Sequence, residues 1–82
     1  MMGKVDTAAS ILELALKETS SDLLQAKTNL SPKLLGEQLK MLRVKDLLEI
    51  SGSGEKVKIT KRGMQFLDLY RSIHARYLQI PA

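Results

Sequence analysis

Residues 49–63, EISGSGEKVKITKRG, contain the feature that most constrains the fold of this chain. Val57 and Ile59 alternate with Lys56 and Lys58, a period of two that is typical of a strand with one buried and one exposed face. A second short apolar run, DLLEI, precedes the segment SGSGE. Glycine supplies the positive φ that tight hairpin turns require. The sequence therefore predicts a β-hairpin with both lysines on its exposed side.

Two other uses of this glycine-rich turn are disfavoured by its spacing and position. A phosphate-binding P-loop needs G-x-x-x-x-G-K-[ST] leading into a helix, whereas these glycines are two apart and a strand pattern follows them. A linker between domains would need more chain on either side. We therefore interpret SGSGE as the tip of a hairpin.

The first helix is predicted by apolar residues at i, i+3, i+4 and i+7. These residues are Ala8, Ile11, Leu12 and Ala15. We expect the helix to span 7–18 with Asp6 as its N-cap. The segment ETSSD at 18–22 then breaks the pattern, because Ser and Thr favour caps over helix interiors.

The second and third helices are short and closely joined. Thr19 and Asp22 have the spacing of a capping box, which predicts a helix over 21–27 with Leu24 as its core anchor. Ser31 is a suitable N-cap, and Pro32 fits the first helical position of a third helix over 32–43. That helix places Leu35, Leu39 and Leu42 on one face and Lys33, Gly36, Glu37 and Lys40 on the other.

The last helix is expected over 61–79 with Thr60 as its cap. Its apolar residues are spaced four, three, four and three apart, which is the a/d pattern of a short coiled coil. These residues are Phe66, Tyr70, Ile73, Tyr77 and Ile80. We expect Phe66, Leu67 and Tyr70 to pack on the domain's own core.

Composition and charge restrict the classes of function. The 82 residues suit one domain, 1–82, with a core over about 6–67. The net charge is +4, with −1 over residues 1–30 and +5 over 31–82. This balance suggests a polyanionic partner, with a solvated surface as the alternative. The absence of cysteine removes disulfides, thiol catalysis and the common structural zinc sites. No apolar run approaches the roughly 20 residues of a membrane span, so we expect a soluble, cytoplasmic protein.

The order helix, helix, helix, hairpin, helix matches a winged helix-turn-helix, and the resemblance extends to motifs. TNLSPKLLGEQLKMLRVKDLLEI and VKITKRGMQFLDLY resemble the small archaeal winged-helix DNA-binding proteins over residues 8–73. The positions that match are Leu30, Ser31, Leu35, Leu39, Leu42, Ile59, Thr60, Gly63, Phe66 and Leu67. Asp46 departs from the family's usual glycine, and Glu37 places an acid on the expected DNA-facing surface. The expected fold is mainly α, with a three-helix bundle, a two-stranded wing and a long C-terminal helix.

The resemblance implies double-stranded DNA as the partner. The helix over 32–43 would enter the major groove and the wing over 50–58 would lie on the backbone. The groove residues implied are Ser31, Lys33, Gly36, Glu37 and Lys40, and the phosphate contacts implied are Lys56, Lys58, Lys61 and Arg62. Lys33 and Lys40 would contact phosphates or guanine, and Glu37 would accept from cytosine N4. The alternative for Glu37 is an exposed residue that pairs with Lys40 one turn along the helix.

The resemblance also implies a homodimer through the C-terminal helix, with Phe66, Tyr70, Ile73, Tyr77 and Ile80 in the interface. The expected role is transcription regulation, or nucleoid architecture. A second class remains open, because winged helices also serve as protein-interaction modules without DNA binding. His74 flanks the heptad positions, no arrangement of Ser, Asp or Glu has usable catalytic spacing, and we expect no enzymatic activity, cofactor, metal or small-molecule ligand.

Overall fold

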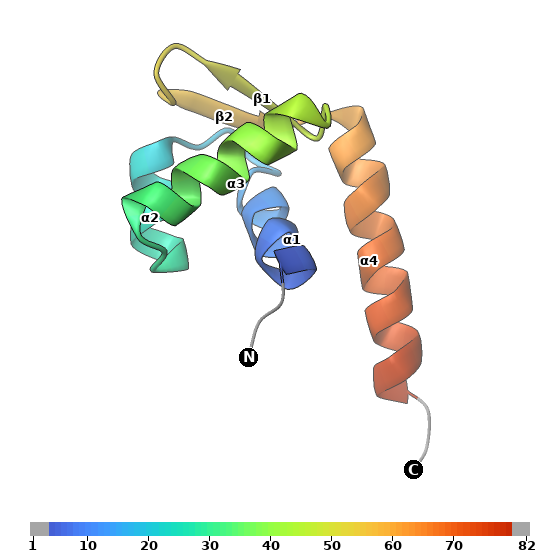
Figure 1. The fold of residues 1–82 in the computed structure, drawn as a ribbon. Coiled ribbons are helices and arrows are strands. Elements are labelled where there is room, and N and C mark those ends of the chain that lie inside the picture. Colours follow the sequence, from blue (N-terminus) through green and yellow to red (C-terminus); the bar gives the residue numbers. More distant parts are fainter. Residues whose placement is uncertain (1–3, 80–82) are drawn as a thin grey trace.

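The computed structural model describes the backbone of residues 4–79 and the side chains of residues 6–73. The helices pack around a shared core, and the two-stranded hairpin lies at one end of them (Figure 1). The elements in chain order are α1 (Lys4–Leu14), α2 (Ser21–Thr28), α3 (Pro32–Val44), β1 (Leu48–Ser51), β2 (Lys56–Ile59) and α4 (Lys61–Gln79). The predicted class, mainly α with one hairpin and a long last helix, is confirmed.

Branched aliphatic side chains from every element meet in a single core. The largest fully buried side chains are Ile11, Leu12, Leu24, Leu42, Leu48, Val57 and Leu67. Leu24 is 0% exposed, as expected for the anchor of α2. Phe66 and Tyr70 are partly buried against this core, which confirms that the first half of α4 packs on the domain itself.

The hairpin is antiparallel, and its register places one face on the core. Ile50 pairs with Val57, and Leu48 pairs with Ile59. Val57 and Ile59 are buried while Lys56 and Lys58 are exposed, so the period-two pattern predicted both faces correctly.

Strand β2 also bonds to the segment that follows α1. The amide of Thr19 donates to the carbonyl of Val57, and the amide of Val57 donates to the carbonyl of Thr19, both at 2.8 Å. The amide of Ile59 donates to the carbonyl of Ala15 at 2.9 Å. The backbone hydrogen bonds on the two edges of β2 are therefore made with different parts of the chain.

The tip of the hairpin is held against the start of α2. Gly52 and Gly54 have φ of 63° and 92°, as a glycine-rich hairpin turn requires. The amide of Ser21 donates to the carbonyl of Gly54 at 2.8 Å, and a Cβ on Gly54 would lie 2.7 Å from Oγ of Ser21. The tip is therefore attached to the domain at its end as well as at its base.

Both expected ends of the first helix and the expected cap of the second helix are wrong. α1 begins at Lys4 and ends at Leu14. Asp6 lies within the helix and accepts a hydrogen bond from Tyr70 instead of capping the helix, and after Leu14 the backbones of Ala15 and Thr19 bond to β2. The Thr19–Asp22 capping box does not form. Ser20 is the N-cap of α2, and its side chain accepts from the amide of Leu23 at 3.2 Å.

The first half of α4 is fixed to α1 and to the chain before β1. The hydroxyl of Tyr70 donates to the carboxylate of Asp6, and Arg71 forms an ion pair with Glu13 at 2.5 Å. Gly63 lies against the carbonyl oxygen of Leu47 and against Ile59. Figure 1 shows α4 beginning beside the end of α3 and running along α1.

The close approach at Gly63 gives a first prediction. In Gly63→Ala the new Cβ would overlap the carbonyl oxygen of Leu47 and lie 2.7 Å from Cγ1 of Ile59, so we expect a loss of about 2–3 kcal/mol in unfolding free energy. The matched control is Gly36→Ala, where a Cβ meets nothing within 4 Å and helix propensity adds about 1 kcal/mol. Urea denaturation measures both. Equal effects on the two variants would contradict the packing described here.

The bond between Tyr70 and Asp6 gives a pH prediction. That hydrogen bond, partial burial and the charges of Asp6 and Glu13 raise the pKa of Tyr70. The unfolded chain therefore loses this proton at a lower pH than the folded chain does, so the stabilisation is complete below about pH 10 and is lost as the pH rises through the folded pKa. Denaturation of wild type and Tyr70→Phe between pH 8 and 11, values chosen to bracket about 10, should show a steeper decline for wild type. Parallel curves would rule the bond out.

Candidate nucleic-acid interface

The turn between α2 and α3 is three residues long and is closed by local hydrogen bonds. Asn29 adopts the left-handed conformation with φ of 61°, and its amide donates to the carbonyl of Gln25 at 3.3 Å. The hydroxyl of Thr28 donates to the carbonyl of Leu24 at 2.7 Å, and the side-chain amide of Gln25 donates to the carbonyl of Leu30. These bonds fix the direction in which α3 leaves α2.

α3 is fixed by its cap and by its inner face. The hydroxyl of Ser31 accepts from the amide of Leu34 at 3.2 Å, with Pro32 at the first helical position. Leu35, Leu39 and Leu42 are all buried. The cap and the leucine stripe predicted from the sequence are confirmed, and together they determine which residues face outward.

The outward face of α3 carries the residues expected there, and all of them are exposed. They are Lys33, Gly36, Glu37 and Lys40, with Ser31 at the start of the helix. Glu37 and Lys40 form no ion pair, since the single ion pair among the side chains of 6–73 joins Arg71 to Glu13. The charged groups of this face are thus unengaged within the described part of the chain.

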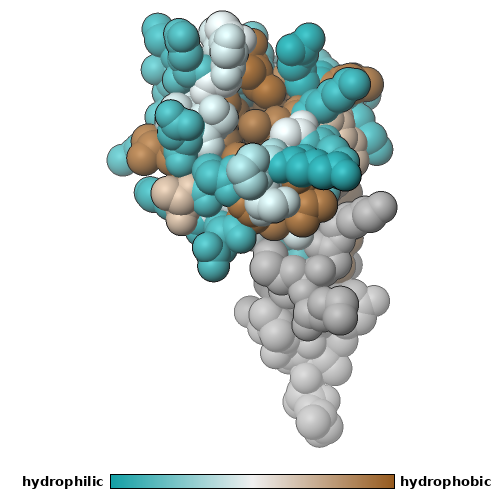
Figure 2. All heavy atoms as spheres, turned by 60° about the vertical axis from the view of Figure 1, so that its left-hand side comes forward, coloured by the Kyte–Doolittle hydropathy of each residue, from teal (hydrophilic) through white to brown (hydrophobic). Residues whose placement is uncertain are grey.

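A groove of about 330 Å³ runs beside this face, between α2 and α3. Leu35 and Leu39 contribute apolar surface to it, Gly36 borders it without a side chain, and Asp22 lies across it on α2. Figure 2, in which the left-hand side of Figure 1 comes forward, shows patches of apolar side chains among hydrophilic ones. The absence of a side chain at residue 36 leaves the backbone of α3 accessible from solvent.

The observed hairpin spans 48–59, longer than the wing expected over 50–58; we call 48–59 the wing from here on, and it carries charges of both signs. Lys56 and Lys58 are exposed as expected. Glu49 lies directly opposite Lys58 in the strand register, and Glu55 is exposed at the tip. The sequence identified the two lysines but not their acidic neighbours, because the opposition depends on the register.

Two further cations lie near Lys61 and Arg62 and were not expected from the sequence as site residues. They are Arg43 and Lys45, both exposed at the end of α3. The hydroxyl of Thr60 donates to the carbonyl of Asp46 at 2.6 Å, which places the start of α4 beside the end of α3 (Figure 1). In the sequence, the segment RVK at 43–45 could have indicated these two cations.

The expected interface residues of α4 differ in their surroundings. Phe66 and Tyr70 are partly buried against the core, whereas Ile73 is 48% exposed. Leu69, which the heptad assignment passed over, is 61% exposed. The side chain of Tyr77 and the whole of Ile80 lie outside the described residues, as does the side chain of His74.

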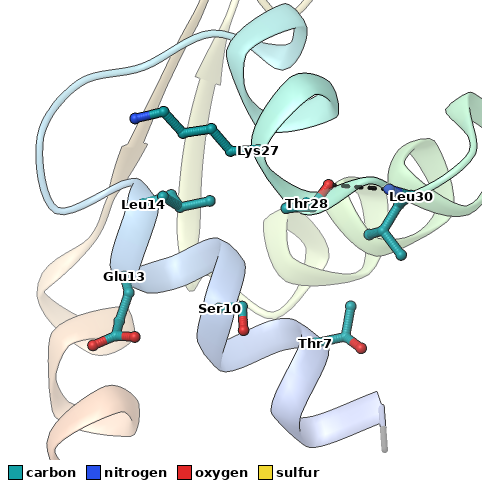
Figure 3. A pocket seen from close by; sticks show the side chains of 7 residues that line it. All are labelled: Thr7, Ser10, Glu13, Leu14, Lys27, Thr28 and Leu30. Carbon is teal, nitrogen blue, oxygen red and sulfur yellow. Dashed lines mark hydrogen bonds between the residues drawn. The ribbon is translucent and has the colours of Figure 1, made fainter. Parts of the chain in front are cut away.

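A second hollow lies between α1 and the α2–α3 turn, with a volume of about 320 Å³ (Figure 3). The charged ends of Glu13 and Lys27 point away from it, and the hydroxyl of Thr28 is engaged with Leu24 and Leu30. The described residues contain no group of three or more His, Cys, Asp or Glu that would hold a metal ion. The hydroxyl-bearing residues Thr7 and Ser10 of α1 also line this hollow.

None of the helices in the described part of the chain is long and apolar enough to cross a membrane.

Comparison with known proteins agrees with this geometry at the level of the family. No curated protein matches the sequence. A family model described as winged helix-turn-helix matches residues 3–77, nearly the whole length, and the three helices, hairpin and last helix follow in the order that this family requires. The chain belongs to the winged helix-turn-helix family.

Proposed function

We propose that this protein binds double-stranded DNA with α3 in the major groove and acts as a regulator of transcription. The observation that carries the proposal is the division of α3 into two faces. Three leucines and a capped N-terminus hold its inner face, while Lys33, Glu37 and Lys40 are exposed and form no ion pair among the described side chains. In helix-turn-helix proteins the second helix of the motif, which here is α3, contacts base edges in the major groove.

The chemistry of the outward face suits the groove. Lysine contacts phosphate oxygens or the N7 and O6 acceptors of guanine, and a carboxylate accepts from cytosine N4. Gly36 permits close approach, since its Cα faces open space. Glu37 repels phosphates, so it favours placement of this face toward bases rather than along the backbone.

We further propose that two copies associate through α4. Leu69 and Ile73 are exposed apolar residues one turn apart on this helix, and Tyr70 is engaged with Asp6 of its own chain. The contact surface proposed here therefore runs through Phe66, Leu69 and Ile73. A two-fold pair would present two copies of α3 to half-sites about one turn of DNA, ~34–36 Å, apart or a multiple of it.

Charge reversal on α3 tests DNA binding. Fluorescence anisotropy with mixed-sequence duplex at several salt concentrations should give a dissociation constant of about 10⁻⁴–10⁻⁶ M near physiological salt for wild type. Lys33→Glu/Lys40→Glu should weaken binding about tenfold or more, because two attractive interactions with phosphate or guanine become repulsive. The matched control is Lys17→Glu/Lys27→Glu, which makes the same charge change on exposed lysines of the near-neutral half.

The outcome separates the two classes of function. Weaker binding by the α3 variant, with binding retained in the control, supports the proposal. Absence of wild-type binding even at low salt overturns it and favours a protein-interaction module. Equal weakening in both variants would mean that binding follows net charge and not α3.

Substitution on α4 tests the dimer. Burying one aliphatic side chain contributes about 1.5–3 kcal/mol, and a two-fold interface contains it twice, so Ile73→Glu should weaken self-association at least about a hundredfold. The matched control is Met64→Glu, because Met64 is 47% exposed on the same helix but lies on a different face. Sedimentation velocity at tens of micromolar should give wild-type and Met64→Glu dimers and an Ile73→Glu monomer. A wild-type monomer at all concentrations contradicts the proposal.

A further inference from the structure

Four cations gather where the end of α3 meets the start of α4. We name this group the basic corner, and its residues are Arg43, Lys45, Lys61 and Arg62. All four are exposed, and none is in an ion pair within the described part of the chain. One acidic residue, Asp46, directly follows Lys45 in the sequence.

The corner is held together by hydrogen bonds that do not use its four charged side chains. Asp46 turns the chain in the left-handed conformation with φ of 60°. The hydroxyl of Thr60 donates to the carbonyl of Asp46 at 2.6 Å, and the amide of Thr60 donates to the carbonyl of Leu47 at 3.1 Å. The absence of a side chain at Gly63 allows α4 to start this close.

The wing has a weaker positive field than the corner. Its two lysines, Lys56 and Lys58, are matched in number by Glu49 and Glu55. Glu49 is the cross-strand neighbour of Lys58, a distance of about 4.5–5.5 Å between Cβ atoms. Four cations with one acid attract a polyanion more strongly than two cations with two acids.

The position of the corner suits the phosphate backbone. Lys33 and Arg43 are ten residues apart on one helix, about 15 Å along its axis, and the major groove is about 12 Å wide. With α3 lying across the groove, its first turn and the basic corner would be far enough apart to reach opposite strands. Figure 1 shows the corner at the end of α3 nearest α4 and the wing tip near the start of α2.

We propose that the basic corner, and not the wing, makes the principal phosphate contacts of this protein on double-stranded DNA. The inference rests on the proposed function, because it assigns roles within that DNA-binding surface. It assigns Arg43 and Lys45 to the interface and limits Lys56 and Lys58 to a minor share.

Neutralising pairs of cations tests this division. Arg43→Gln/Lys45→Gln and Lys61→Gln/Arg62→Gln each remove two charges from the corner, and Lys56→Gln/Lys58→Gln removes the same charge from the wing. The slope of log affinity against log salt falls by about 0.9 for each phosphate that the protein no longer neutralises, so each corner variant should lower it by about 1.8. The wing variant should change the slope by less than half as much as either corner variant does. All sites are exposed, and thermal unfolding checks that each variant is folded.

The outcomes distinguish this inference from the proposed function. If wild type fails to bind duplex at low salt, the proposed function fails. If wild type binds and the wing variant lowers the slope as much as either corner variant does, the inference fails while DNA binding remains. If the corner variants lower the slope and the wing variant lowers it by less than half as much, the assignment is supported.

Discussion

The fold depends on the hydrogen bonding of β2 on both of its edges. On one side β2 pairs with β1, and on the other Val57 exchanges two backbone bonds with Thr19. Val57 itself is fully buried, so the strand connects the hairpin to the core and to the segment after α1. This arrangement ends α1 at Leu14, positions the start of α2 and thereby determines where α3 lies.

Much of this fold was predictable because local patterns and tertiary packing agree. The leucines of α3, the Ser31 cap and the alternation in β2 each predicted the observed element. The failures were at places where a distant contact competes with a local signal, as for Asp6, which bonds to Tyr70. No local rule contains a partner 64 residues away, so such contacts were beyond sequence reasoning.

The candidate site was predictable to a different degree in each part. The outward face of α3 follows directly from its buried face, because side chains in a helix repeat their direction every 3.6 residues. The balance of charge on the wing depends on which residues oppose one another, and only the register places Glu49 against Lys58. Similarly, either Leu69 or Tyr70 could occupy an apolar heptad position. Only the packing of α4 on α1 determines that Leu69 is the exposed residue of the two.

The attachment of the hairpin tip to Ser21 has a consequence for how a partner is bound. A free wing samples many conformations, and ordering it on association costs entropy, about 0.5–1.5 kcal/mol for each side chain immobilised and more for the loop itself. Here the carbonyl of Gly54 is already bonded to the amide of Ser21, so part of this ordering precedes any encounter. The end of the wing is therefore partly preorganised, and association of a partner with the surface formed by α2, α3 and the hairpin would resemble the docking of a rigid body more than coupled folding and binding.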